Sequence, residues 1–157
     1  NLRNRDRIIM NEFDFKSQIC TSREQSEKLL KLGLRKETAD FFIPVKLNPD
    51  KESLPCHLDF WISDDLFIKR VREASIPAWS LARLVEMMPK VITLCHPNLH
   101  FTMLHDSVHY CNFDYDEEFE QVFSAKNNIY DNIIDCYEWL IKNWYFDEVL
   151  LNKEKEK

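Results

Sequence analysis

Glycine is almost absent from this chain of 157 residues, in which Gly33 is the only one. Backbone cradles for nucleotide phosphates need several glycines, as in G-x-G-x-x-G and G-x-x-x-x-G-K-[ST], because the main chain must approach the phosphate closely. The G-x-S-x-G turn that carries the nucleophile of α/β-hydrolases is missing as well. The sequence therefore excludes the common glycine-loop nucleotide sites and this hydrolase class.

Long apolar runs are also missing, since no segment approaches the ~18 apolar residues of a transmembrane helix. The basic start, NLRNRDRIIM, lacks the apolar stretch of a secretory signal peptide. The five cysteines are widely spaced, odd in number and without a C-x-x-C pair, so we interpret them as reduced and mostly buried thiols. We expect a cytoplasmic protein without a membrane segment.

Basic residues are outnumbered by acidic ones, and the net charge is −6. Sequence-independent binding to DNA or RNA needs a concentrated basic surface, so we do not expect a nucleic-acid partner. An acidic run lacks the glycine and the spacing of an EF-hand, and we interpret it as a solvated face or an electrostatic docking patch. This run contains Asp114, Asp116, Glu117, Glu118 and Glu120.

Apolar and aromatic residues are plentiful, at 45% and 13% of the chain, and can form a sizeable core. Residues 20–34 predict a helix with two possible capping boxes, Thr21/Glu24 and Ser22/Gln25, and with Gly33 at the left-handed position after its end. Residues 40–47 and 56–62 predict two strands joined by a polar turn, the first of them at a sheet edge because it contains Pro44.

The segment IPAWSLARLVEMMPK, residues 76–90, predicts a helix that Ser80 caps and Pro89 ends. Trp79 and Leu84 have the spacing of a hydrophobic staple across this cap. We interpret this helix as core-packed, with a partner-binding helix as the alternative. The preceding residues, 63–75, predict a further helix that begins at Ser63.

The second half of the chain predicts two or three strands over residues 90–113, including a hairpin around residues 105–107. Residues 114–126 predict an acidic loop or short helix, and residues 127–146 predict a long helix that Asn128 caps. The order of elements predicts an α+β fold: a single domain with a mainly antiparallel sheet of about 4–5 strands, on which three to four helices pack. We place this domain at 11–150, after a basic extension at 1–10 in which Met10 is a candidate native start, and before a charged tail at 151–157.

Three segments in order, ICTSREQSEKLLKLGL with TADF, IPAWSLARLVEMMPK and NIIDCYEWLIKNWYF, resemble a family of small uncharacterised proteins. Such proteins are encoded by gut-type bacteria, often in prophages and other mobile elements. The matching segments cover about a third of the chain. The resemblance implies a cytosolic accessory protein of a mobile element and carries no known activity.

Histidine and cysteine gather in residues 95–111, which hold four of the five histidines. On a hairpin, His109 and Cys111 share a face, and His105 lies near the turn, so these three are the candidate ligands of a zinc site. Their spacing matches no standard zinc module, and our main interpretation is surface or interface histidines with Cys111 in the core. We therefore expect no cofactor, with zinc as the alternative.

Catalysis by a thiol would need Cys111 or Cys56 beside a histidine. His57 adjoins Cys56, but adjacent strand residues face opposite ways. No catalytic residue is therefore predicted, and we expect a protein that is not an enzyme.

Three aromatic rings stand in sequence at the end of the last helix: Trp144, Tyr145 and Phe146. One helix end cannot bury all three against one layer, so we expect one or two at a contact surface, with Trp79 as a further candidate. The leading hypothesis is a non-enzymatic interaction protein that binds a protein partner, including itself as a homodimer. The alternatives are a nucleotide-type small-molecule binder of a mobile element and a zinc-containing domain.

Overall fold

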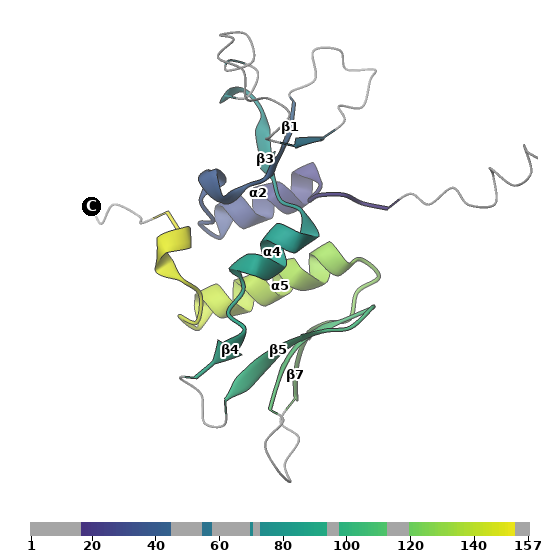
Figure 1. Cartoon of the computed structure of the whole chain (residues 1–157), viewed down its shortest axis with the longest axis vertical. Coiled ribbons are helices and arrows are strands. Elements are labelled where there is room, and N and C mark those ends of the chain that lie inside the picture. The colour runs from purple at the N-terminus through teal and green to yellow at the C-terminus, as the bar shows by residue number, and fades with distance from the viewer. Residues whose placement is uncertain are drawn as a thin grey trace, which may run out of the picture.

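A computed structural model describes residues 17–44, 55–57, 70, 73–93, 98–112 and 120–152, with only the backbone at 120–123. Within these residues it contains three α-helices: α2 (Arg23–Lys31), α4 (Leu81–Met87) and α5 (Ile129–Lys142). The helices form a middle layer between two antiparallel sheets (Figure 1). The α+β fold is confirmed, but its strands form two sheets where the sequence predicted one.

The smaller sheet has the order β2-β1-β3, with β1 at Phe41–Ile43, β2 at Cys56–His57 and β3 at Ile76–Ala78. The prediction that the strand near Pro44 lies at an edge was wrong, because β1 is central and ends before the proline. Pro77 lies in β3, which pairs only with β1 among the described strands. An edge strand tolerates proline because its missing N–H is not needed there.

The larger sheet has the order β4-β5-β6-β7, with strands at Val91–Ile92, Leu99–Met103, Val108–Cys111 and Glu120–Ser124. The predicted hairpin is confirmed, and the Leu104 backbone N–H donates to the Ser107 carbonyl across its turn (2.9 Å). The prediction of an acidic loop or short helix over 114–126 was wrong for the second half of this segment, which forms β7. Pairing with β6 overrides the local preference, because it satisfies backbone groups of both strands.

Helix α2 begins and ends as its sequence predicts. Of the two possible capping boxes, Ser22 with Gln25 forms, and Gly33 follows the helix at φ 96°. The Leu34 and Gly33 backbone N–H groups donate to the Leu29 and Leu30 carbonyls, both at 3.0 Å. These two bonds are a Schellman ending, which needs a left-handed residue at the glycine position.

Helix α4 is a core-packed helix, as we interpreted it. The Ser80 hydroxyl accepts from the Arg83 backbone N–H at 3.1 Å, and Asp40 accepts from the backbone N–H and the hydroxyl of Ser80 at 2.8 and 2.5 Å. Leu84 is fully buried, and the chain turns out of the helix before Pro89. The helix expected at 63–75 lies mostly outside the described residues.

Helix α5 lies at the centre of the molecule, between α4 and the larger sheet (Figure 1). Its fully buried Asn132 accepts from Ser124 Oγ (2.6 Å) and from the Lys126 backbone N–H (2.7 Å), and donates to the carbonyls of Asp106 and Lys126 (both 3.1 Å). This amide therefore joins α5 to the hairpin turn and to the end of β7.

The first two residues of the charged tail that we expected at 151–157 are bonded to the rest of the fold. Leu151 pairs with Leu34 as an isolated antiparallel bridge, and the Asn152 backbone N–H donates to the Gly33 carbonyl at 2.7 Å. These bonds fix the short 3-10 helix η3 (Glu148–Leu150) against the end of α2. The basic extension expected at 1–10 and the rest of the charged tail lie outside the described residues.

Candidate functional site

Trp144 follows Asn143, the C-cap residue of α5, and has a backbone that is unusual for its side chain. Its φ is 61°, and it is the only non-glycine residue with a positive φ among those described. Its N–H donates to the Ile141 carbonyl (3.2 Å), and that of Tyr145 donates to the Leu140 carbonyl (2.9 Å). Helix α5 thus ends in the same Schellman motif as α2, with tryptophan where α2 has Gly33.

The indole of Trp144 gains nothing from burial in its own chain, because the residue is 80% exposed. A left-handed conformation costs a non-glycine residue about 1–2 kcal/mol, and an exposed indole keeps a large apolar surface in water. Neither feature stabilises the folded chain. Strained and exposed residues of this kind are concentrated at functional sites.

The next two rings are packed. Tyr145 is partly buried, with its ring centroid 5.2 Å from that of Trp139. Phe146 is buried, with its ring 5.0 Å from that of Tyr137. Of the three rings expected near a contact surface, Trp144 is therefore the one that the fold leaves in solvent, and Phe146 belongs to the core.

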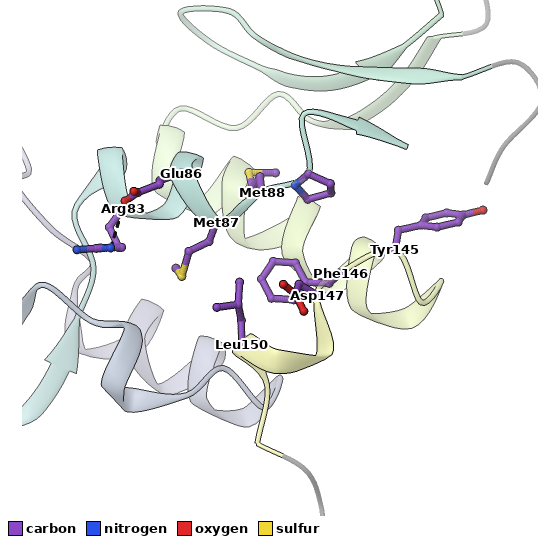
Figure 2. A pocket seen from close by; sticks show the side chains of 9 residues that line it. Arg83, Glu86, Met87, Met88, Tyr145, Phe146, Asp147 and Leu150 are labelled. Carbon is purple, nitrogen blue, oxygen red and sulfur yellow. Dashed lines mark ion pairs between the residues drawn. The ribbon is translucent and has the colours of Figure 1, made fainter. Parts of the chain in front are cut away.

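A groove lies beside this helix end, between α4 and the segment that follows α5 (Figure 2). Its volume is about 580 Å³. Figure 2 shows Met87, Phe146 and Leu150 converging on its middle, with the Arg83–Glu86 pair on one side and Tyr145 on the other. The full lining consists of Arg83, Glu86, Met87, Met88, Pro89, Tyr145, Phe146, Asp147 and Leu150.

The charges around the groove are unbalanced. Arg83 forms an ion pair with Glu86 at 3.1 Å, while the Asp147 carboxylate accepts the Val149 backbone N–H at 2.9 Å and so caps η3. One cation therefore faces two carboxylates, and the cation is already paired. This lining favours an apolar side chain with a basic neighbour over a phosphate.

Buried tyrosines hold α4 in its place at the groove. The Tyr137 hydroxyl donates to the Leu84 carbonyl at 2.8 Å, and the Tyr110 hydroxyl donates to the Pro89 carbonyl at 2.6 Å. Burial raises the pKa of both phenols, so they stay protonated and able to donate. Across the groove, the Arg35 backbone N–H donates to the Leu150 carbonyl at 3.0 Å. Both walls are thus fixed by hydrogen bonds.

The proposal of Trp79 as a surface residue was wrong. Its side chain is fully buried, and its indole N–H donates to Thr38 Oγ1 at 2.9 Å. Its backbone N–H donates to Thr21 Oγ1 at 3.0 Å, which joins the start of α4 to the start of α2. Trp79 is a core residue and cannot reach a partner in this structure.

The three candidate zinc ligands differ in their exposure. His109 is buried with Nε2 2.5 Å from Ser107 Oγ, while Cys111 is partly buried with Sγ 3.4 Å from Thr102 Oγ1. The side chain of His105 is 96% exposed. No three His, Cys, Asp or Glu side chains gather to hold a metal ion in the part of the chain that the structure describes. Cys95, His96 and most of the acidic run are outside that part.

Two other thiols are unsuited to nucleophilic catalysis. Burial, with a smaller contribution from the nearby Asp40, raises the pKa of Cys20 to about 11. Burial also raises the pKa of Cys136. A protonated thiol is a poor nucleophile, so these two cysteines are packing residues.

Comparisons with protein-family models, with curated proteins and with solved structures found no match for this chain. Among the described residues, no helix has the length and apolar character needed to cross a membrane.

The sequence did not indicate the groove itself. Met87 and Leu150 are distant in the chain, and their convergence depends on how the C-terminal segment returns to α2. One local signal pointed to Trp144: the sequence KNWYF ends a helix without the glycine that follows α2.

Proposed function

We propose that the protein is a non-enzymatic interaction protein that binds a protein partner through a surface beside the end of α5. This surface, called the Trp144 surface below, comprises Trp144 and the groove lined by Met87, Phe146, Asp147 and Leu150. The single observation that carries the proposal is the exposed indole of Trp144 on a left-handed backbone. Glycine would suit that position better if stability of the isolated chain were all that mattered.

The chemistry of the surface fits protein recognition. Tryptophan is among the residues most enriched at binding hot spots, where a large ring fills a desolvated pocket. Met87, in the middle of the groove, adapts its flexible side chain to an incoming apolar group. Charged Arg83 and Glu86 stand beside this apolar centre, as polar residues do around the core of an interface.

A nucleotide-type ligand is supported less well by the same groove. Tyr145 could stack on a base, but Arg83 is already paired with Glu86. Asp147 adds a second negative charge that repels phosphate. The groove therefore favours a protein segment over a nucleotide.

The biological setting that we propose rests on sequence resemblance alone. Three segments in matching order support a cytoplasmic accessory protein of a bacterial mobile element. An interaction protein without an active site suits that setting, because such accessory proteins can act by binding another protein.

Capture from a bacterial lysate with matched baits tests the proposed function. The baits are the wild-type protein, Trp144→Gly and Leu104→Ala. Leu104 is 53% exposed at the hairpin turn, so its variant controls for the loss of an exposed apolar side chain elsewhere. We expect a protein retained by the wild type and by Leu104→Ala, and reduced at least about tenfold on Trp144→Gly, the usual loss for a hot-spot residue.

Two results would contradict the proposal. One is a set of bound proteins that does not change with Trp144→Gly. The other is a nucleotide or a stoichiometric zinc ion found by native mass spectrometry of the untagged protein, which would favour the alternatives.

A further inference from the structure

We infer that the occupant of the groove is Trp144 of a second copy of this chain, exchanged reciprocally across a two-fold axis. The inference rests on the proposed function and names the partner of the Trp144 surface. It is carried by three features of the described residues: the position of the anchor beside its receptor, the charges around both, and the outward direction of the indole.

The anchor and the receptor are adjacent in the chain. Trp144 immediately precedes Tyr145, Phe146 and Asp147, which line the groove. A two-fold interface uses the same patch on both copies, so the patch must be complementary to itself. A projecting ring beside a groove meets this condition, because one rotation places each ring in the other copy's groove.

The indole cannot fill its own groove in this structure. With φ at 61°, Trp144 turns out of α5 as the chain leaves the helix, and its side chain is in solvent, whereas Phe146 two residues later is buried in the groove wall. The backbone that directs the ring outward is held by the two hydrogen bonds of the helix ending. A ring exposed in this way is available to a second molecule.

The charges beside the anchor complement those of the groove. The groove has an excess of negative charge from Glu86 and Asp147, and Lys142 stands two residues before Trp144 with its side chain 68% exposed. Lys142 pairs with Glu138 in its own chain, but an exposed pair of this kind is weak and exchanges readily. The chain thus presents the apolar anchor and basic neighbour that its own groove favours.

The contact is small, so the dimer should be weak. Two indoles bury roughly 150–250 Å² each, and even with the surrounding contacts this falls below a standard interface of about 1,600 Å². We expect a dissociation constant on the order of 10 µM, as for other small and transient interfaces.

Mixing two defective variants tests the exchange directly. Trp144→Gly removes the anchor and keeps the groove, while Met87→Glu keeps the anchor and places a charge in the groove. We expect each variant alone to associate at least about tenfold more weakly than the wild type, as measured by sedimentation velocity. We expect an equimolar mixture to form a heterodimer more strongly than either variant forms a homodimer, because one intact ring then meets one intact groove.

Leu150→Glu is the second groove variant, and it replaces Met87→Glu if that protein lacks the circular dichroism of the wild type. Leu104→Ala should associate like the wild type. An unimpaired groove variant, or a mixture no stronger than its components, would overturn the exchange. A monomeric wild type at concentrations up to about 1 mM would also overturn it, while a Trp144-dependent partner in the capture experiment would leave the proposed function standing.

Discussion

At the scale of single residues, Trp144 and Gly33 give a matched pair. Both follow a helix, both have a positive φ, and both donate the same type of helix-ending hydrogen bond. Only glycine adopts this backbone without a steric penalty. Trp144 therefore carries a steric penalty that Gly33 does not. This penalty is the free energy of folding that the chain loses by placing an indole at position 144.

Substitutions at these two positions should change the free energy of unfolding in opposite directions. We predict that Trp144→Gly raises the free energy of unfolding by about 1 kcal/mol, because it removes the left-handed penalty. Gly33→Ala should lower it by a similar amount, although nothing lies within 4 Å of the added Cβ. Urea unfolding at a protein concentration too low for association measures both. A destabilised Trp144→Gly would show that the indole supports the fold of its own chain.

The buried thiol of Cys20 predicts a loss of stability in alkaline solution. Burial, and then Asp40, raises its pKa from 9.0 in the unfolded chain to about 11 in the folded one. The folded state therefore holds this proton more tightly than the unfolded chain does. The contribution of the thiol to the free energy of unfolding is complete below pH 9 and is lost as the pH rises from 9 to 11.

Comparison of the wild type with Cys20→Ala isolates this effect, because the other buried thiol and phenols are common to both proteins. We predict that the difference in free energy of unfolding between them changes by about 1 kcal/mol between pH 8 and pH 10, with the wild type losing more. Urea unfolding at pH 8, 9 and 10 gives the difference. A constant difference over this range would mean that the thiol is solvated.

At the scale of the elements, tyrosine hydroxyls connect α4 to its neighbours. Tyr137 on α5 donates to the Leu84 carbonyl in the last turn of α4, and Tyr110 on β6 donates to the Pro89 carbonyl just beyond it. Carbonyls near the end of a helix have no partner within the helix. The two phenols supply partners and so set where α4 borders the groove.

Removing one of these hydroxyls should be costly. We predict that Tyr137→Phe lowers the free energy of unfolding by about 1–2 kcal/mol, because a buried carbonyl loses its donor. Tyr130→Phe is the matched control, since its hydroxyl makes a longer bond of 3.4 Å to the Gln18 carbonyl in a less buried place. Thermal unfolding of the wild type and of both variants gives the stability that each variant loses. A Tyr137→Phe protein as stable as the wild type would show that the Tyr137 bond adds nothing beyond ring packing.

Sequence reasoning succeeded for features that depend on neighbours in the chain. The cap at Ser80, the capping box at Ser22, the glycine after α2 and the hairpin before Val108 each follow from a few adjacent residues. These signals have local physical causes, namely unsatisfied backbone groups and turn geometry. They were therefore readable without knowledge of the fold.

Features that depend on distant contacts were not predictable in the same way. The order of the strands around β1 and the pairing of β7 with β6 are settled by tertiary packing. The same holds for Trp79, whose burial depends on Thr21 and Thr38. The groove also arises only when η3 returns to the end of α2.

At the scale of the whole molecule, the helical layer joins the two sheets (Figure 1). The groove of the Trp144 surface lies between α4 and the segment that follows α5. Its two walls are held from both sides, by the buried tyrosines behind α4 and by the bridge between Leu34 and Leu151 beside η3. A groove fixed in this way changes little on binding. Its occupant then loses little affinity to reorganisation of the protein.

Association should be visible as concentration-dependent stability. Because the dimer forms only from folded chains, we predict that the Tm of the wild type rises with protein concentration above the dissociation constant. The Tm of Trp144→Gly should stay constant over the same range, although it starts higher at low concentration. Differential scanning calorimetry at about 5 µM and 500 µM tests this against the expected dissociation constant. Parallel rises in both proteins would place the contact elsewhere.

The most direct test of the central claim is sedimentation velocity of the wild type and Trp144→Gly over the same concentration series. The account predicts that the wild type shifts from monomer to dimer at concentrations on the order of 10 µM, and that Trp144→Gly stays monomeric about tenfold higher. A wild type that stays monomeric throughout, or a variant that dimerises as the wild type does, would contradict it.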